Sequence, residues 1–445
     1  MICRNFIFFA LCGVFFSFCI WPQPQPGVWK NRPEKIQLEV DDKEIPLSFI
    51  YQQDTSSKIT VVQIFIKGGT RAVQVSKRGL AFLTTRLSVE MPAAKNVRDL
   101  MHLASTFLYH VDGDYSTITI ESLSENIDET LEIITKILRK PLFSGLRINS
   151  IKKYMEHGQK REEDSPEQLM ERTCFNTFFP GYSGSIFGDP ESRKKIKKKD
   201  IVQFYNRFFN RSNMVISVSS NLEKPEVEKL VKKYFGGFPA GEPIEPQPVA
   251  VPVPGEKEFF LKKDNQQVLI SFGARLPEMS RENFAMIYML ENLLGKGIGS
   301  KLWPLRAKKD LAYNLNTRFK LLKDGGLLII YLKTNGEKID EAYRALKKLI
   351  TGVYKTGITK EELESTRMRS RADFLRDNET KIKKTRTLAY FEALGTGFDF
   401  LEAFFSYVDK TTLADFNGFL KKVLNPDQLI EVIIGPHGYP STIQD

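Results

Sequence analysis

The sequence predicts an α+β fold with two similar units, each a mostly antiparallel sheet covered by helices. The chain has 445 residues, which is more than one hydrophobic core usually serves. Strand and helix patterns follow one another in the same order in the two halves. A proline-rich segment separates these halves. Length, repetition and this segment together favour two homologous domains in one chain.

The clearest repeat is an amphipathic helix that recurs at one constant offset. Each copy carries four apolar residues at helical spacing. They are Ile127, Leu131, Ile134 and Leu138 in the first half, and Ile339, Tyr343, Leu346 and Ile350 in the second. A duplicated unit is the simplest explanation.

Strand patterns accompany these helices in both halves. They lie at 60–67, at 107–122 as a hairpin turning at 112–114, and at 214–218, and then at 267–272, 327–332 and 429–434. A helix is expected after the first strand of each half, at 79–88 and 283–294. The prolines favour an extended linker at 239–256, because proline lacks an amide proton and fixes its φ angle. The predicted domains are therefore 36–238 and 257–440.

The composition is that of a folded globular protein. Hydrophobic residues make up 42% and charged residues 27%, and the mean hydropathy of −0.28 excludes a polytopic membrane protein. The net charge of +11 is densest at 193–199. We interpret that run as a solvated loop before a helix at 201–209 capped by Asp200, and we expect no nucleic-acid partner because no nucleic-acid motif accompanies it. Cys174 is interpreted as a small buried hydrophobic residue.

Residues 1–26 have the layout of an export signal. Arg4 precedes an apolar run at 6–21, and prolines follow at 22–26. The run is shorter than the about 20 residues that a membrane-spanning helix needs. We therefore expect an exported protein, either periplasmic or membrane-anchored and facing the periplasm, with any membrane attachment limited to this segment. Cleavage, lipidation and retention of the segment all stay open.

The histidines provide no zinc-binding helix. A zinc peptidase needs three protein ligands and a carboxylate that takes a proton from the metal-bound water. In the pattern His-x-x-Glu-His, one helix supplies two of these ligands and the carboxylate. The chain has four histidines, His102, His110, His157 and His437, and no two of them have this spacing.

The helix expected at 79–87 nevertheless has a familiar context. It reads Gly-Leu-Ala-Phe-Leu-Thr-Thr-Arg-Leu and follows a strand and the pair Gly68-Gly69. This arrangement resembles the amino-terminal domain of the insulinase and pitrilysin metallopeptidase family, which includes proteins like the mitochondrial processing peptidase. The resemblance continues through 178–182, 188–192 and 234–239, and it implies two homologous domains that form half of a clamshell.

This resemblance assigns the lost metal site. The family's helix carries Gly-Leu-Ala-His-x-x-Glu-His, so its two histidines fall on Phe82 and Arg86 and its glutamate falls on Thr85. The third ligand, a glutamate on a later helix, would fall near Gly158. We therefore expect no metal in this chain and no peptidase activity from the chain alone.

The second half keeps a different motif. The segment 295–306 and the following 310–313 resemble the family's glycine-rich Ser-x-Leu … Leu-Arg … Gly-Leu-Ala-Tyr motif, although Ala307 and Asp310 stand where the family often has glutamate and glycine. The resemblance implies that Arg306 and Tyr313 donate hydrogen bonds to a substrate carbonyl, and that the loop binds an extended peptide. The loop residues are Gly295, Gly297, Gly299 and Ser300.

Two hypotheses follow from the resemblance. In the first, the chain is the zinc-free subunit of a heterodimeric peptidase and lends Arg306 and Tyr313 to a zinc-bearing paralogous subunit that cleaves extended peptides. In the second, it is an inert peptide-binding or scaffold protein of the same fold. A peptidase with an unusual metal site of its own is a third reading, which stoichiometric zinc in the isolated chain would support.

Overall fold

The structure is a computed structural model that describes residues 31–40, 46–91, 93–180, 185–244, 257–264, 266–295, 297–307 and 310–436. The predicted export segment and residues 245–256 of the predicted linker lie outside these ranges. All described residues belong to the compact unit that begins at Asn31. None of the helices in these ranges is long and apolar enough to cross a membrane.

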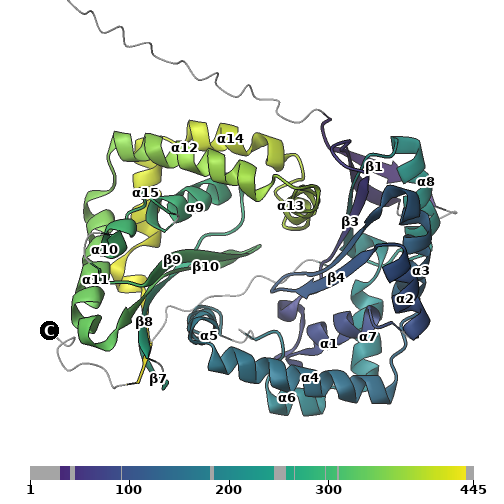
Figure 1. Cartoon of the computed structure of the whole chain (residues 1–445), viewed down its shortest axis with the longest axis horizontal. Coiled ribbons are helices and arrows are strands. Elements are labelled where there is room, and N and C mark those ends of the chain that lie inside the picture. The colour runs from purple at the N-terminus through teal and green to yellow at the C-terminus, as the bar shows by residue number, and fades with distance from the viewer. Residues whose placement is uncertain are drawn as a thin grey trace, which may run out of the picture. The chain divides into compact units, whose positions relative to one another are not determined.

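The first half forms a six-stranded sheet (Figure 1). Its strands are β1 (Glu34–Leu38), β2 (Leu47–Gln53), β3 (Ile59–Ile66), β4 (Thr106–Val111), β5 (Ser116–Leu123) and β6 (Met214–Ser220). Their order across the sheet is β1-β2-β6-β3-β5-β4, and only the pairing of β2 with β6 is parallel. Strand β4 therefore forms one edge of this sheet.

The second half repeats this arrangement with five strands. They are β7 (Glu258–Lys262), β8 (Gln267–Leu276), β9 (Asn314–Leu322), β10 (Gly325–Asn335) and β11 (Ile430–Gly435). The order is β7-β11-β8-β10-β9, and only β7 and β11 are parallel. The order and strand directions match β2-β6-β3-β5-β4, and this agreement is the structural counterpart of the sequence repeat.

Apart from α8, the helices follow the strands in the same order in both halves. The first half contains α1 (Leu80–Ser88), α2 (Ala94–His102), α3 (Ile127–Arg139), α4 (Gly145–Asp164), α5 (Pro166–Phe178), α6 (Pro190–Lys195), α7 (Lys198–Phe208) and α8 (Lys224–Phe235). The second half contains α9 (Arg281–Leu294), α10 (Trp303–Ala307), α11 (Ile339–Thr356), α12 (Lys360–Asp377), α13 (Lys381–Ala393), α14 (Phe400–Lys410) and α15 (Leu413–Val423). The predicted amphipathic helices are α3 and α11, and the predicted α+β class is confirmed.

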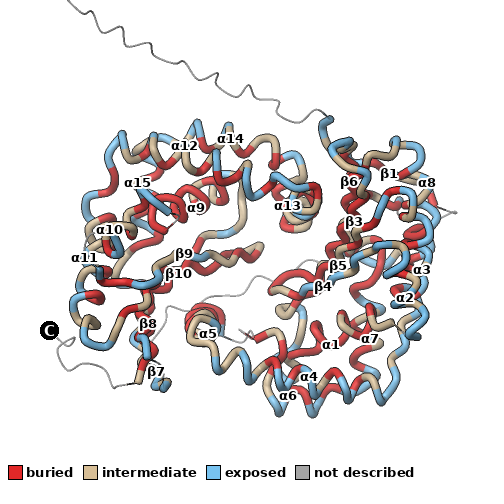
Figure 2. Tube along the Cα trace, in the orientation of Figure 1, coloured by how far each residue is buried: buried red, intermediate tan, exposed pale blue. Residues whose placement is uncertain are grey.

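Both faces of the first sheet are buried where β3 runs through it (Figure 2). Successive side chains of a strand point to opposite faces. Ile64 and Ile66 join a core with residues of α1, α3, α7 and α8. Phe65 points the other way and packs with Tyr115 and with Ala389 of α13. The sheet is therefore the middle layer between helices of its own half and a helix of the other half.

Each half contributes one helix that packs against the sheet of the other half. Helix α13 of the second half packs against β3 and β6, whereas α5 of the first half packs against β8, β10 and β11. The α5 contact is apolar, with Cys174, Phe175 and Phe178 against strand residues such as Ile329 and Val432. Cys174 is fully buried there, as predicted.

The α13 contact is more polar. The Lys381 ammonium is buried and donates to the carbonyl oxygens of Asp54, Ser57 and Ile59 at 2.7, 3.0 and 2.8 Å. Lys384 also pairs with Asp54 at 3.1 Å. Burial lowers the pKa of Lys381, but its three carbonyl acceptors favour the protonated form.

Two expectations about the basic run are wrong. Helix α7 begins at Lys198, so Asp200 is not its N-cap but its third residue, where the carboxylate accepts from the amide of Lys197 at 2.8 Å. The run is also not a loop throughout, because Arg193 lies in α6, is buried, and donates to Gln159 at 2.7 Å. The lysines of the run are exposed, as expected.

Candidate functional site

Helix α1 carries a phenylalanine in place of the first expected metal ligand. Gly79 starts the helix with a left-handed backbone, φ 94°, which glycine adopts without strain. Phe82 is only 4% exposed. Its ring lies 4.8 Å from the ring of Phe187, in an edge-to-face arrangement, and 6.0 Å from Tyr109. The position is therefore filled by a buried aromatic cluster.

The region near Gly158, where the resemblance places the third ligand, is filled from the same cluster. Gly158 lies on α4, and a β-carbon added there would be 2.6 Å from Cζ of Phe187. The neighbouring Glu156 and His157 are exposed. The Phe187 ring thus occupies the space that a side chain at position 158 would need. The site has no room for a carboxylate that could reach α1.

Thr85 and Arg86, at the other two expected positions, make hydrogen bonds and ion pairs within this chain. Thr85 is buried and donates to the hydroxyl of Ser116 at 3.1 Å. Arg86 pairs with Glu90 at 2.5 Å and lies over the ring of Tyr109 at 5.5 Å. Across the described ranges, no group of three or more His, Cys, Asp or Glu residues could hold a metal ion. These residues do not fit zinc, because a zinc site needs three converging ligands.

Arg306 and Tyr313 lie at the two ends of one connection in the second half. Arg306 is exposed on α10, and its guanidinium lies 5.8 Å from the ring of Trp303. Tyr313 directly precedes β9, and the residue is 59% exposed. Its amide donates to the carbonyl of Lys333 on β10 at 2.9 Å, which fixes the backbone there. Both side chains are available at the surface of this chain.

The connection keeps the backbone turn that glycine would allow. Asp310 has a positive φ of 50°, and aspartate tolerates this left-handed region better than most residues. The ammonium of Lys338 bonds both the carbonyl and the carboxylate of Asp310 at 2.8 Å. The departure from the family's glycine therefore preserves the local chain direction.

The glycine-rich loop lies beside β9. Gly295 is buried, and a β-carbon added there would be 2.3 Å from Oγ1 of Thr317 on β9. Gly297 and Gly299 have positive φ angles of 72° and 88°. Ser300 is buried, and the following residue, Lys301, is bonded through its amide to the carbonyl of Leu293 on α9. The structure thus brings this loop to the same strand that begins after Tyr313.

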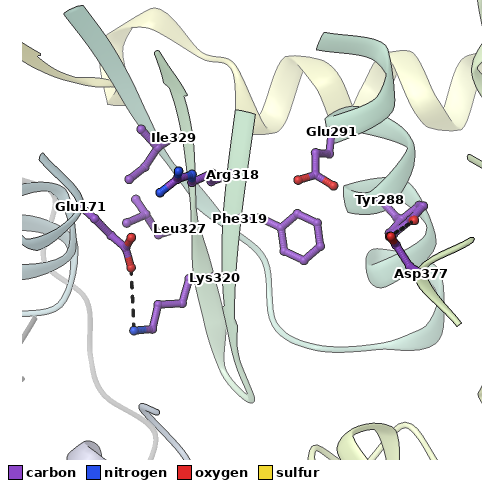
Figure 3. A pocket seen from close by; sticks show the side chains of 9 residues that line it. All are labelled: Glu171, Tyr288, Glu291, Arg318, Phe319, Lys320, Leu327, Ile329 and Asp377. Carbon is purple, nitrogen blue, oxygen red and sulfur yellow. Dashed lines mark hydrogen bonds and ion pairs between the residues drawn. The ribbon is translucent and has the colours of Figure 1, made fainter. Parts of the chain in front are cut away.

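A cavity of about 340 Å³ extends along β9. Figure 3 shows its lining, with Glu171 of α5 and the strand residues Arg318 and Lys320 on one side, and Tyr288 and Glu291 of α9 on the other. Lys320 lies 4.0 Å from Glu171. Since β9 is the last strand of its sheet, the cavity borders an open strand edge.

A buried ion network fixes the far end of β9. The Arg71 guanidinium pairs with Asp114 of the β4–β5 turn and with Asp324 of the β9–β10 turn, both at 2.6 Å. Asp114 also accepts from the amide of Lys323 at 2.6 Å. Burial raises the pKa of Asp114 despite the Arg71 charge. The network therefore joins the hairpin turns of the two halves.

Sequence reasoning missed three parts of this site. Phe187 gave no signal because its partners are distant in the chain. Arg71 and its two aspartates lie in turns, where charged residues are common. Arg369 of α12, which bonds the glycine-rich loop, belongs to a strongly charged helix without a distinguishing pattern.

Comparisons with known proteins agree with this geometry. Residues 195–370 match the family described as the peptidase M16 inactive domain. A relative from Helicobacter pylori, described as "Non-peptidase homolog YmxG", is 23% identical over 392 residues, which is 86% of this chain and 90% of the relative. A relative from Bacillus subtilis, described as "Uncharacterized zinc protease YmxG", is 19% identical and covers 88% of this chain and 97% of its own.

A solved structure shares the fold. The peptidase M16 inactive domain from Pseudomonas fluorescens superposes with a TM-score of 0.82 and 18% identity, covering 92% of this chain and 99% of that chain. The sequence likeness and the structural likeness each extend over most of both chains.

Proposed function

Since the chain belongs to the insulinase/pitrilysin-type metallopeptidase family, peptidase M16, and is a non-catalytic member of it, we propose that it is the zinc-free subunit of a two-subunit peptidase. In this proposal a zinc-bearing paralogous subunit provides the metal and the general base. This chain provides Arg306 and Tyr313. The complex acts outside the cytoplasm, in keeping with the export segment predicted at residues 1–26.

The observation that carries the proposal is a contrast between the two halves. In the first half, Phe82 and Phe187 fill the metal position with buried aromatic rings. In the second half, Arg306 and Tyr313 stay exposed, and the turn between them keeps a left-handed residue at Asp310. A chain that had lost all function would have no reason to preserve one motif and fill the other.

Arg306 and Tyr313 suit the chemistry of peptide hydrolysis. When water attacks a peptide carbonyl, negative charge develops on the carbonyl oxygen. A tyrosine hydroxyl and a guanidinium both donate hydrogen bonds to such an oxygen, and the loss of one donor typically raises the barrier by about 3 kcal/mol. The two side chains would therefore act on a substrate held mainly by the partner's zinc.

An extended peptide is the substrate class that the surroundings favour. Strand β9 is an open sheet edge, and an edge strand binds an extended peptide through main-chain hydrogen bonds with modest sequence preference. The cavity along β9 presents both acidic and basic side chains: Glu171, Arg318 and Lys320 lie on one side, and Glu291 lies on the other. Such a mixture accepts peptides of varied charge.

The test mixes the purified chain with a paralogue that carries an intact His-x-x-Glu-His helix and follows hydrolysis of a dye-labelled casein peptide. We expect the mixture to exceed either chain alone, and we expect Arg306→Ala and Tyr313→Phe each to lower hydrolysis about a hundredfold. Arg344→Ala, which changes an exposed arginine of α11, is the matched control. Hydrolysis that does not rise on mixing would refute the proposal. A stable complex whose hydrolysis ignores Arg306 and Tyr313 would instead favour the inert scaffold.

A further inference from the structure

The glycine-rich loop is held by a hydrogen bond from an arginine of helix α12. Nη1 of Arg369, on α12, donates to the carbonyl of Gly299 and to the hydroxyl of Ser365, both at 3.0 Å. Nη2 donates to Oγ1 of Thr366 at 3.3 Å and to the carbonyl of Asn292 on α9 at 3.5 Å. One guanidinium therefore ties the loop to two helices.

The charge of this guanidinium is not neutralised by its hydrogen-bond partners, which are all uncharged oxygens. Three acidic residues of α12 pair with other cations: Glu362 with Lys301, Glu364 with Arg367, and Asp373 with Arg376. Burial, with no carboxylate contribution, lowers the pKa of the Arg369 guanidinium. The guanidinium therefore places an unpaired positive charge directly beside the loop.

The bond from Arg369 fixes part of the loop backbone. The carbonyl of Gly299 is turned toward Arg369, and the amide of Ser300 bonds the carbonyl of Gly297 at 3.2 Å. Among the residues that the structure describes, the amides of Ile298 and Gly299 donate to no backbone carbonyl. Ile298 is 78% exposed. The loop therefore offers two amides and one apolar side chain, next to a positive charge.

We propose that Arg369 is a positioning residue for the peptide site, because it holds loop 297–300 with its amides toward a peptide carbonyl oxygen. The inference rests on the proposed function, since it assumes that an extended peptide binds beside β9. The positive charge behind the loop strengthens the attraction of these amides for an oxygen that carries partial negative charge. Arg369 itself need not touch the peptide.

The test uses the full chain in three variants. Arg369→Gln removes the charge. Arg369→Lys keeps the charge but loses the paired hydrogen bonds from Nη1 and Nη2. Arg371→Gln is the matched control. Arg371 lies on the same helix and pairs with Asp409 at 2.6 Å, away from the loop. Hydrogen exchange of residues 295–301 reports the loop, and the affinity for a dye-labelled casein peptide reports the site.

We expect Arg369→Gln to speed exchange in the loop and to weaken peptide binding about ten- to a hundredfold, since hydrogen bonds to a charged group are lost. Arg369→Lys should recover part of the affinity, and Arg371→Gln should match the wild type in both measurements. Equal peptide affinity of wild type and Arg369→Gln would overturn the inference alone, as would an equal loss in Arg371→Gln. A wild-type chain that binds no peptide would also overturn the inference, whereas the proposed function is refuted separately, by hydrolysis that does not rise on mixing with the paralogue.

Discussion

Replacing Gly158 by alanine tests whether Phe187 really occupies the third ligand position. Gly158 lies inside α4, and alanine in a helix interior is ordinarily more favourable than glycine by about 1 kcal/mol. Here the new β-carbon would lie 2.6, 2.7 and 3.0 Å from three ring carbons of Phe187, well inside the about 3.5 Å of normal contact. The ring has little freedom to move, because Phe82 packs against it with 4.8 Å between ring centroids.

The two effects have opposite signs, so the measurement is decisive. Overpacking a core typically costs about 1–3 kcal/mol, and after the helix gain we expect Gly158→Ala to lower the free energy of unfolding by up to about 2 kcal/mol. In a Phe187→Ala background the ring is gone, and the same change should stabilise the protein by about 1 kcal/mol.

Urea unfolding of the four proteins of this double-mutant cycle measures the change of sign. Gly352→Ala is the control, since Gly352 lies inside α11 with open space around its added β-carbon, and that variant should be stabilised. If Gly158→Ala proves as stabilising as Gly352→Ala, the account of the filled metal site is wrong.

Three further results are expected. Arg71→Ala leaves two carboxylates in the buried network and should cost about 3–5 kcal/mol in urea unfolding, whereas an exposed-pair cost below 1 kcal/mol would show that the network is not buried. Burial raises the pKa of Asp54, but hydrogen bonds from Ser56 and the charge of Lys384 lower it to about 2. The stability that the Asp54 carboxylate contributes is therefore present above pH 4 and is lost as the pH falls toward 2. Acid titration of the free energy of unfolding should show this loss, and Asp54→Asn should remove it. The triple change Phe82→His, Thr85→Glu and Arg86→His should leave the purified chain without stoichiometric zinc by elemental analysis, because the third ligand is still absent.

Local patterns were sufficient for most of the fold. The apolar faces of α3 and α11 can be predicted because helical spacing repeats every three to four residues. The helix without metal ligands can be predicted because its sequence at 79–87 resembles the family's zinc helix. The exposed positions of Arg306 and Tyr313 fit the role predicted for them, and that role stays a prediction.

Contacts between distant segments could not be predicted in the same way. An apolar helix face indicates burial but does not identify the sheet that buries it. The sequences of α5 and α13 therefore do not show that each helix packs against the sheet of the other half. The error at Asp200 has a local cause, because an aspartate near a helix start can serve as the N-cap or as the third residue. Phe187 packs against Phe82 of α1 from the segment between α5 and α6, which is distant from α1 in the sequence.

The exchanged helices limit how such a chain could have arisen. Helices α5 and α13 occupy equivalent places in the repeat, and each covers a sheet face of the other half. A single ancestral unit would therefore have buried that face only by pairing with a second copy, each lending a helix to the other. Fusion of two copies turns this dimer into one molecule, in which the copies no longer need to stay identical. One copy could then lose its metal ligands while the other kept its arginine and tyrosine.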